Sequence, residues 1–287
     1  MRLAKQRIIS IFQKLPFRWQ VAISRFKSSL GYYIKTERRE LVVNYFLGHY
    51  SIHVDTANDV ERRFLSGGYE DDTLAIVRKL VRPGDICLDI GANVGAVTIA
   101  LADQVGTAGR VYSFEPGPSF QERLRSNLLL NPSIASVVIP DGRALSIANT
   151  KLKWQLSTTA HGTATTYENG MDSSAPVVEV EAIRIDDHPT LKSLARLNFI
   201  KLDVDGLEYE ILQGGSQTLQ KHRPILYYET NMWNEEMKLA AKNIEKLIEG
   251  WGYRIFRVDP STFELSPAKF PDYTFNTVAI HSESNQN

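Results

Sequence analysis

From residue 85 onward the sequence alternates between short apolar segments and longer amphipathic ones. Segments such as DICLDI, RVYSFEP, LNFIKLDV and RPILYYET have the length and composition of buried strands. The stretches between them have helical spacing, as in VGAVTIALADQV, in SFQERLRSNLLLN with Ser119 as its expected cap, and in one helix expected over 207–222. This order predicts an α/β fold with a doubly wound, mostly parallel Rossmann-like sheet.

The N-terminal part of the chain has a different character. Residues 1–35 carry eight Lys or Arg and no acidic residue, with apolar side chains at helical spacing, and residues 41–55 read as a β-hairpin interrupted at Gly48. We interpret residues 1–64 as an extension made of a basic amphipathic helical segment and a β-hairpin. The main domain is expected over residues 65–282, followed by a frayed tail over 283–287.

A basic amphipathic helix has two interpretations, and both stay open here. It can lie on an anionic membrane surface, or it can pack on the core or on a second subunit. No apolar run reaches the length that spans a bilayer, and the N-terminus lacks the features of a secretory signal. The expected location is the cytoplasm, at the membrane periphery if residues 1–30 bind lipid. The single cysteine, Cys87, is expected to be a buried thiol in a reducing compartment.

The segment LDIGANVG follows the first strand of the alternating region. Its glycines, Gly91 and Gly95, allow a close approach of backbone that a Cβ would prevent. The pattern is not a phosphate-binding P-loop, which needs Lys after its last glycine. It is not the dinucleotide fingerprint either, because Asn93 stands where that fingerprint has its second glycine. A nicotinamide-dependent oxidoreductase is therefore disfavoured.

Acidic residues end the first three strands of this region. Asp89 directly precedes the glycine loop, where a carboxylate would repel a pyrophosphate but suits a positively charged ligand. Glu115 ends the second strand, where it can accept hydrogen bonds from ribose hydroxyls, and Asp141 ends the third, where it can accept from an adenine amine. S-adenosylmethionine (SAM) fits this set because it carries an ammonium and a sulfonium but no phosphate.

Several segments together resemble the FkbM family of SAM-dependent methyltransferases, within the class I superfamily. They are PGDICLDIGANVGAVTIAL, VYSFEPGPSFQERLRSNLLLN, the ALS at 144–146, FIKLDVDGLEYEILQGG and RPILYYET. The resemblance implies a seven-stranded sheet with an antiparallel last strand. It also implies methyl transfer to a hydroxyl of a sugar, polyketide or glycolipid-type acceptor. One departure is Asp205, where the family usually has Glu.

We therefore expect SAM to be held by a defined set of residues. Its methionyl part is assigned to Asp89, Gly91, Asn93 and Gly95, its ribose to Glu115 and its adenine edge to Asp141. A hydroxyl acceptor must lose a proton during methyl transfer, so a base near the methyl group is needed. Asp203 and Glu229, at the ends of the fourth and fifth strands, are the expected catalytic residues.

Alternatives accompany these assignments. Asp205 and Glu208 can instead cap the next helix, and Lys201 can pair with a carboxylate. Asp203, Glu229 and Asn231 also resemble the oxygen ligands of Mg²⁺ in catechol-type methyltransferases, which makes Mg²⁺ a secondary expectation. The long loop over 158–175 contains His161, a candidate acceptor base, and Trp154 and Trp233 are candidate pocket residues.

The partners expected from the sequence are few. The acceptor is a small molecule or glycan, and the zero net charge gives no indication of a nucleic-acid partner. The sequence is compatible with a homo-oligomer. A functional hypothesis of another class is a non-catalytic methyltransferase-like scaffold that binds a partner or a membrane through its basic N-terminus.

Overall fold

The computed structural model describes most of the chain after residue 39. The described ranges are 40–56, 58, 61–66, 69–155, 177–204, 206–230, 234–259, 261–272 and 276–283. Several sequence-based expectations lie outside them: the basic helical segment, His161 with the rest of the 158–175 loop, Asp205, Asn231 and Trp233.

The described residues divide into two compact units, one that ends at Glu70 and one that begins at Asp71. The first contains the strands β1 (Glu40–Phe46) and β2 (Tyr50–Asp55), which pair antiparallel, and the short helix α4 (Arg63–Ser66). The β-hairpin expected over 41–55 is thus confirmed. Its strands are held to α4 by aromatic packing, since the ring of Phe64 lies edge-on to Phe46 and stacks on Tyr69.

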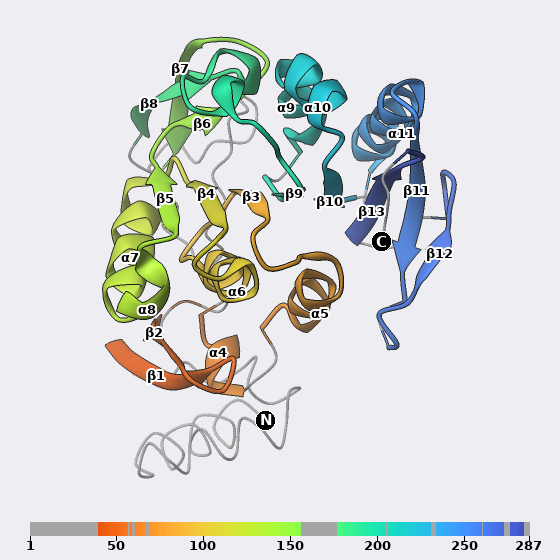
Figure 1. Cartoon of the computed structure of the whole chain (residues 1–287). Helices are drawn as coiled ribbons and strands as arrows, with labels where there is room; N and C mark the ends of the chain where they lie inside the picture. The colour runs from red at the N-terminus through yellow and green to blue at the C-terminus, as the bar shows by residue number, and fades with distance from the viewer. Residues whose placement is uncertain are drawn as a thin grey trace, which may run out of the picture. The chain divides into compact units, whose positions relative to one another are not determined.

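The second unit is built on an eight-stranded sheet with the order β12-β11-β13-β10-β9-β3-β4-β5 (Figure 1). Its strands are β3 (Ile86–Ile90), β4 (Arg110–Phe114), β5 (Val138–Asp141), β9 (Phe199–Leu202), β10 (Ile225–Glu229), β11 (Tyr253–Val258), β12 (Leu265–Pro267) and β13 (Asn276–His281). Strands β5, β4, β3, β9 and β10 are parallel, and β13, the last in the chain, is antiparallel to both its neighbours. The expected mostly parallel sheet with an antiparallel last strand is confirmed. Seven strands were expected, and the sheet has an eighth, the edge strand β12.

The strand order fixes where a ligand can bind. From β3 the chain moves outward to β4 and β5, and it later returns to the other side of β3 with β9 and β10. The order therefore reverses between β3 and β9. In open α/β sheets ligands bind outside the carboxyl ends of the strands at such a reversal. The glycine loop that follows β3 lies at this point.

Helices follow the strands as the sequence predicts, with two corrections. They are α5 (Asp71–Leu80), α6 (Ala96–Val105), α7 (Pro118–Leu129), α8 (Pro132–Ala135), α9 (Glu208–Gly214), α10 (Ser216–His222) and α11 (Glu235–Gly250). The single helix expected over 207–222 is broken at Gly215. A Cβ at Gly214 would collide with the carbonyl oxygen of Ser146, so the chain passes close to another segment there. Ser119 is not the cap of α7, which begins at Pro118 after Gly117.

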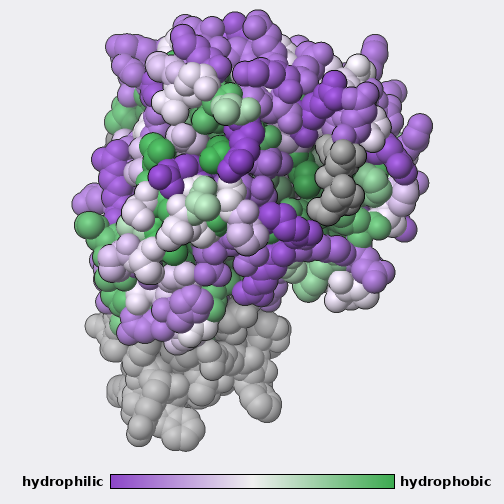
Figure 2. All heavy atoms as spheres, viewed as in Figure 1, coloured by the Kyte–Doolittle hydropathy of each residue, from purple (hydrophilic) through white to green (hydrophobic). Residues whose placement is uncertain are grey.

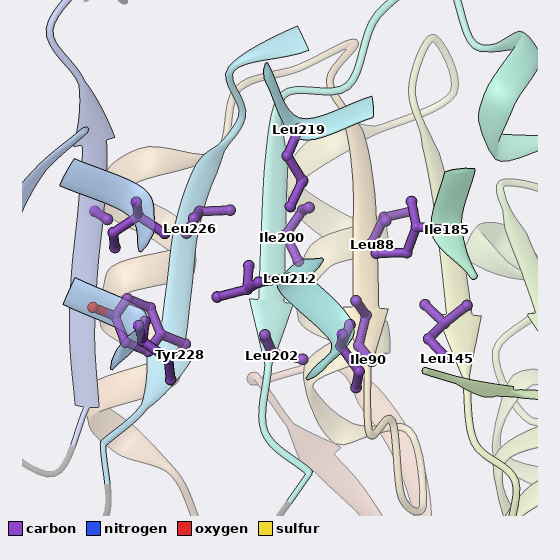
Figure 3. Packing of buried hydrophobic residues seen from close by; sticks show 14 of the residues in the cluster. Leu88, Ile90, Leu145, Ile185, Ile200, Leu202, Leu212, Leu219, Leu226 and Tyr228 are labelled. Carbon is purple, nitrogen blue, oxygen red and sulfur yellow. The ribbon is translucent and has the colours of Figure 1, made fainter. Parts of the chain in front are cut away.

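One cluster of core residues lies on one face of the large sheet. Figure 3 shows Leu212 of α9 and Leu219 of α10 beside Ile200 and Leu202 of β9, with Leu88 and Ile90 of β3 next to them. All of these side chains are almost completely buried. Because side chains alternate along a strand, residues 89 and 201 point to the opposite face. The face shared by Asp89 and Lys201 is the one covered by α6.

A small three-stranded sheet follows β5 in the chain. It consists of β6 (Ala144–Leu145), β7 (Thr150–Gln155) and β8 (Val177–Ile183), with β8 in the middle. Leu145 and Ile183 are direct partners, so the segment between them leaves and re-enters the fold at one place. In Figure 1 this sheet lies beyond the carboxyl end of β5. Trp154 on β7 approaches Gly117, which follows β4.

The surface shown in Figure 2 is mainly hydrophilic where residues are described, with smaller apolar areas between the polar ones. Within the described ranges no helix has the length and hydropathy needed to cross a membrane. Cys87 is fully buried in β3, as expected.

Candidate functional site

Polar side chains form a row across the middle of the large sheet. The register pairs Ser113 of β4 with Asp89 of β3, Asp89 with Lys201 of β9, and Lys201 with Tyr227 of β10. Thr98 of α6 donates a hydrogen bond to Asp89 Oδ2 at 2.6 Å and lies 3.1 Å from the Ser113 hydroxyl. Such a row is unusual in the interior of a parallel sheet, where apolar side chains predominate.

Two residues further along each strand, a second row lies at the carboxyl edge. It consists of Glu115, Gly91, Asp203 and Glu229, because each of them follows a member of the first row by two positions. The structure therefore brings together four of the eight residues expected to form the site. Asp203 is 40% exposed, whereas Glu229 is 8% exposed. The side chain of Asp203 is thus the more accessible of the two proposed catalytic carboxylates.

The glycine loop is shaped by contacts within the protein. Gly91 has a φ of +76°, and a Cβ at this position would collide with the backbone carbonyl oxygen of Asp203. Asn93 has a φ of +51°, and its side chain accepts a hydrogen bond from the Val94 amide at 2.8 Å. Asn is among the residues that tolerate this left-handed conformation best. The close approach that the glycines predict is thus, at Gly91, an approach of the loop to the end of β9.

Asp89 is completely buried, and its carboxylate faces groups of the protein itself. Its Oδ1 atom accepts no hydrogen bond and lies 3.5 Å from the Lys201 ammonium nitrogen. Asp89 is expected from the sequence to face a positive charge, and among the described residues that charge is Lys201. A direct contact between Asp89 and SAM stays a prediction.

Glu115 is also buried and joins two loops. Its Oε2 accepts a hydrogen bond from the Asn93 amide at 2.9 Å, and its Oε1 accepts one from the Gly117 amide at 2.8 Å. Burial raises the pKa of Glu115 from its ordinary 4.5 to about 7, although these hydrogen bonds and the charge of Lys201 act in the opposite direction. The carboxyl group therefore changes its charge near neutral pH, at the place predicted to bind a ribose.

Asp141, at the end of β5, is held by two neighbours. Arg143 donates to both carboxylate oxygens, at 3.0 and 2.6 Å, and His188 Nε2 lies 3.1 Å from Oδ2. His188 accepts the Leu191 amide on its other ring nitrogen, at 3.2 Å. Partial burial raises the pKa of Asp141, but the hydrogen bonds from His188 and Arg143 outweigh it and hold the pKa well below its ordinary value. An adenine amine would therefore share a carboxylate that is already engaged.

A cavity of about 420 Å³ opens beside Asp141. It is lined by residues that follow β4 and β5 and by residues of β8: Pro116, Pro118, Gln121, Gly142, Arg143, Glu179, Val180 and Glu181. The volume lies within the range of small-molecule sites. Gln121 bridges the loops after β4 and β5, because its amide donates to the carbonyls of Pro116 and Gly142.

Glu208 organises the turn after β9. Its Oε1 accepts hydrogen bonds from the amides of Val204, at 3.0 Å, and Gly206, at 3.4 Å. This agrees with the alternative in which Glu208 has a structural capping role. Among the described residues, no three His, Cys, Asp or Glu side chains are grouped so as to hold a metal ion, and Mg²⁺ therefore gains no support.

Residues that the sequence argument did not assign also shape the site. No sequence motif surrounds Arg143, Gln121 or His188, so their roles could not be predicted. Their contacts arise only when the ends of β4 and β5 and the 3₁₀ helix over Ile185–Asp187 meet. Lys201 was expected only to pair with a carboxylate, and it lies within 3.5 Å of two, those of Asp89 and Asp203.

Comparisons with known proteins agree with the geometry. A family model described as "Methyltransferase FkbM domain" matches residues 89–255. The 2-O-methyltransferase NoeI of Sinorhizobium fredii is 29% identical over 182 residues, which cover 58% of this chain and 72% of NoeI. The hexuronic acid methyltransferase AglP of Haloferax volcanii is 26% identical over 152 residues, which cover 53% of this chain and 58% of AglP.

One solved structure that this chain matches is that of methyltransferase FkbM from Methylobacillus flagellatus KT. It has a TM-score of 0.46 and 16% identity to this chain. The match covers 77% of this chain and 52% of that protein, so the chain spans about half of its length.

Proposed function

The chain belongs to the FkbM family of SAM-dependent methyltransferases, and from this membership we propose that it methylates a hydroxyl of a sugar-type acceptor. The observation that carries the proposal is the row formed by Glu115, Gly91, Asp203 and Glu229 at the carboxyl edge of the sheet. In the proposal, Glu115 at one end of the row binds the ribose, and Asp203 and Glu229 at the other end face the acceptor.

The residues present fit SAM as the donor. Each oxygen of Glu115 accepts one backbone hydrogen bond and retains lone pairs for the two ribose hydroxyls. The cavity bounded by Pro116, Gly142 and Arg143 lies on the side of Glu115 where adenine is expected. We assign the methionyl part to the loop from Gly91 to Gly95, toward β9. Asp141 would act on the adenine edge together with Arg143.

The main contribution of the protein to this reaction is to orient the acceptor relative to the methyl group. SAM supplies a methyl group that is already activated by its sulfonium. The chain's own residues must place the acceptor hydroxyl in line with that methyl group and accept its proton. We assign these tasks to Asp203, whose carboxylate is the more exposed, with Glu229 beside it on the next strand. A negative edge also suits a cationic donor.

The sugar-type acceptor is supported by the two curated relatives, one of which is a 2-O-methyltransferase and the other a hexuronic acid methyltransferase. The small sheet formed by β6, β7 and β8 lies beyond the carboxyl end of β5, on the side where the donor is expected (Figure 1). We propose that this sheet forms part of the acceptor side. Trp154 on β7, close to Gly117, would present its ring to a sugar.

The test is a two-step experiment on the full chain. SAM binding is first measured by isothermal titration calorimetry. The protein is then incubated with SAM and a panel of mono- and oligosaccharides, including hexuronic acids, and products heavier by one methylene group are sought by mass spectrometry. Absence of SAM binding by a folded sample would refute the proposal.

Asp203→Asn distinguishes the assigned catalytic role from a general loss of structure. This variant should bind SAM with an affinity close to that of the unchanged protein but turn over at least about a hundredfold more slowly, the usual contribution of a positioned acid or base. The matched control is Asp272→Asn, which alters an exposed carboxylate in the loop after β12 and should leave turnover unchanged. Equal turnover in both variants would remove Asp203 from the mechanism.

A further inference from the structure

The ammonium group of Lys201 is buried at the junction between the two rows of the site. The residue is only 4% exposed. Its Nζ donates a hydrogen bond to the Gly91 carbonyl at 2.6 Å and a longer one to the Ile90 carbonyl at 3.4 Å. It also lies 3.5 Å from both Asp89 Oδ1 and Asp203 Oδ2. Lys201 thus contacts both the strand that carries the glycine loop and the residue that ends β9.

These contacts exceed what charge balance alone requires. A buried ammonium ion must be paired, and Asp89 in the same row already provides a carboxylate for that purpose. Of these four contacts, the shortest is instead the one to the Gly91 carbonyl, in the loop assigned to the donor. Because Gly91 also touches the backbone of Asp203, the ammonium completes a closed set of contacts between the ends of β3 and β9.

We propose that Lys201 is a positioning residue for donor binding, tying the carboxyl ends of β3 and β9 together and fixing the loop that receives the methionyl part of SAM. This inference rests on the proposed function, since it takes SAM as the ligand of that loop. Lys201 acts on the donor through the Gly91 carbonyl and needs no contact with the reacting atoms.

The charge of Lys201 also affects the pH midpoint of SAM binding, which a purely structural role would not change. Its ammonium lowers the pKa of Glu115, whereas the carboxylate of Asp89 raises it. Removing Lys201 should therefore move the pH midpoint of SAM binding upward, and removing the charge of Asp89 should move it downward. Among the described residues, Asp203 is a further charged group near this set.

The experiment compares Lys201→Met with its parent in an Asp89→Asn background. Replacing Lys201 alone would leave Asp89 as an unpaired buried charge and disturb folding. The amide oxygen introduced by Asp89→Asn can still accept the hydrogen bond from Thr98, so the background retains that contact. SAM affinity is measured by calorimetry across the neutral pH range, and the unfolding temperature is measured without ligand.

The double variant should bind SAM about tenfold more weakly than Asp89→Asn alone, the loss expected for one hydrogen bond from a charged donor. Its pH midpoint should be higher, and its unfolding temperature close to that of the single variant. Equal affinity and equal midpoints would overturn the proposal. Lys238→Met, which breaks an exposed ion pair with Glu235 on α11, is the control and should change neither quantity.

Lys201→Arg in the otherwise unchanged chain is the second variant, needed if the double variant does not fold. It keeps a positive charge beside Asp89, but its wider planar head cannot occupy the place of the ammonium 2.6 Å from the Gly91 carbonyl. SAM affinity should fall while the protein stays folded, and unchanged affinity would refute the positioning role. If the unchanged protein itself fails to bind SAM, it is the proposed function that fails.

Discussion

The backbone carbonyl oxygen of Asp203 occupies the space that a Cβ at Gly91 would need. The two residues lie at the ends of adjacent strands, where the strand order of the sheet reverses. The glycine that marks the donor loop in the sequence is thus required first of all by the neighbouring strand. Any ligand bound at this loop is placed relative to Asp203 by that contact.

Gly91→Ala should destabilise the protein by on the order of 2–5 kcal/mol, the sum of a strained left-handed backbone and of overpacking against a rigid carbonyl. The free energy of unfolding, obtained from urea denaturation, measures the effect. SAM binding should also be lost, because the loop and the end of β9 must move apart.

Gly106→Ala is the matched control for this substitution. Gly106 has a φ of +60° at the end of α6, but a Cβ there would meet no atom within 4 Å. The control should cost only the backbone strain, about 1–3 kcal/mol because its φ and ψ of +60° and −168° lie in a region that is essentially restricted to glycine, and should leave SAM affinity unchanged. If both variants were equally destabilised, the close contact between Gly91 and Asp203 would add nothing to the cost of the Gly91→Ala substitution.

SAM affinity should increase as the pH rises through about 7. The reason is that burial raises the pKa of Glu115 to about 7, and only the ionised carboxylate can accept hydrogen bonds from both ribose hydroxyls. Below that pH, affinity should fall by about tenfold per pH unit. Calorimetry on the unchanged protein and on Glu115→Gln provides the measurement, and the variant should bind weakly with a flat profile. An affinity independent of pH in the unchanged protein would exclude this role for Glu115.

The ligand-free protein should lose stability as the pH rises from about 4.5 to 7. Burial raises the pKa of Glu208 from 4.5 to about 7. A carboxyl group with a raised pKa keeps its proton longer in the folded chain than in the unfolded chain. Its contribution therefore favours folding at low pH and is lost as the pH passes through 7.

Glu208→Gln should reduce the difference in the free energy of unfolding between pH 4.5 and pH 7 by on the order of 2–3 kcal/mol. The Gln amide oxygen can still accept the hydrogen bonds from Val204 and Gly206. Glu122→Gln, on the exposed side of α7, is the control and should leave the slope unchanged. Urea denaturation at the two pH values is sufficient. If Glu208→Gln left the pH dependence of the free energy of unfolding unchanged, Glu208 would not be its cause.

Arg143→Met should destabilise the protein by about 1.5–3 kcal/mol, the range for hydrogen bonds to charged groups. The guanidinium donates two hydrogen bonds, one to each oxygen of Asp141, in a partly buried setting. SAM affinity should fall as well, since Arg143 lines the cavity assigned to adenine.

Lys151→Met tests whether any lost ion pair would have the same effect. Lys151 pairs with Glu179 at 3.2 Å, but both side chains are about two thirds exposed. Water screens such a pair, so the substitution should cost no more than about 0.5 kcal/mol. Thermal unfolding and SAM titration on both variants give the comparison, and a similar cost for both would show that the setting of Arg143 adds nothing.

Local pattern predicted much of the architecture. The apolar segments became β3, β4, β5, β9 and β10, and the acids at their ends came to one edge, because parallel strands place their carboxyl ends together. The break between α9 and α10 was not foreseen. It depends on the approach of Gly214 to Ser146, a contact between segments far apart in the chain.

The partners of the site residues were the harder part to predict. The sequence around Asp141 does not indicate its contact with His188, which lies 47 positions later in the chain. The register between β3 and β9 likewise decides that Lys201 lies opposite Asp89. A sequence gives the order of strands far more readily than the alignment of one strand against another.

The pairing of Leu145 with Ile183 has a consequence for how such a protein can diverge. Within the small sheet, the chain leaves β6 after Leu145 and returns beside it at the end of β8, with the Ser146 amide hydrogen-bonded to the Ile183 carbonyl. A loop with such closely spaced ends can be lengthened, shortened or exchanged while the scaffold around it is retained. If the small sheet forms the acceptor side as proposed, selection can therefore change the acceptor within one stretch of sequence and leave the strands of the proposed donor site unchanged.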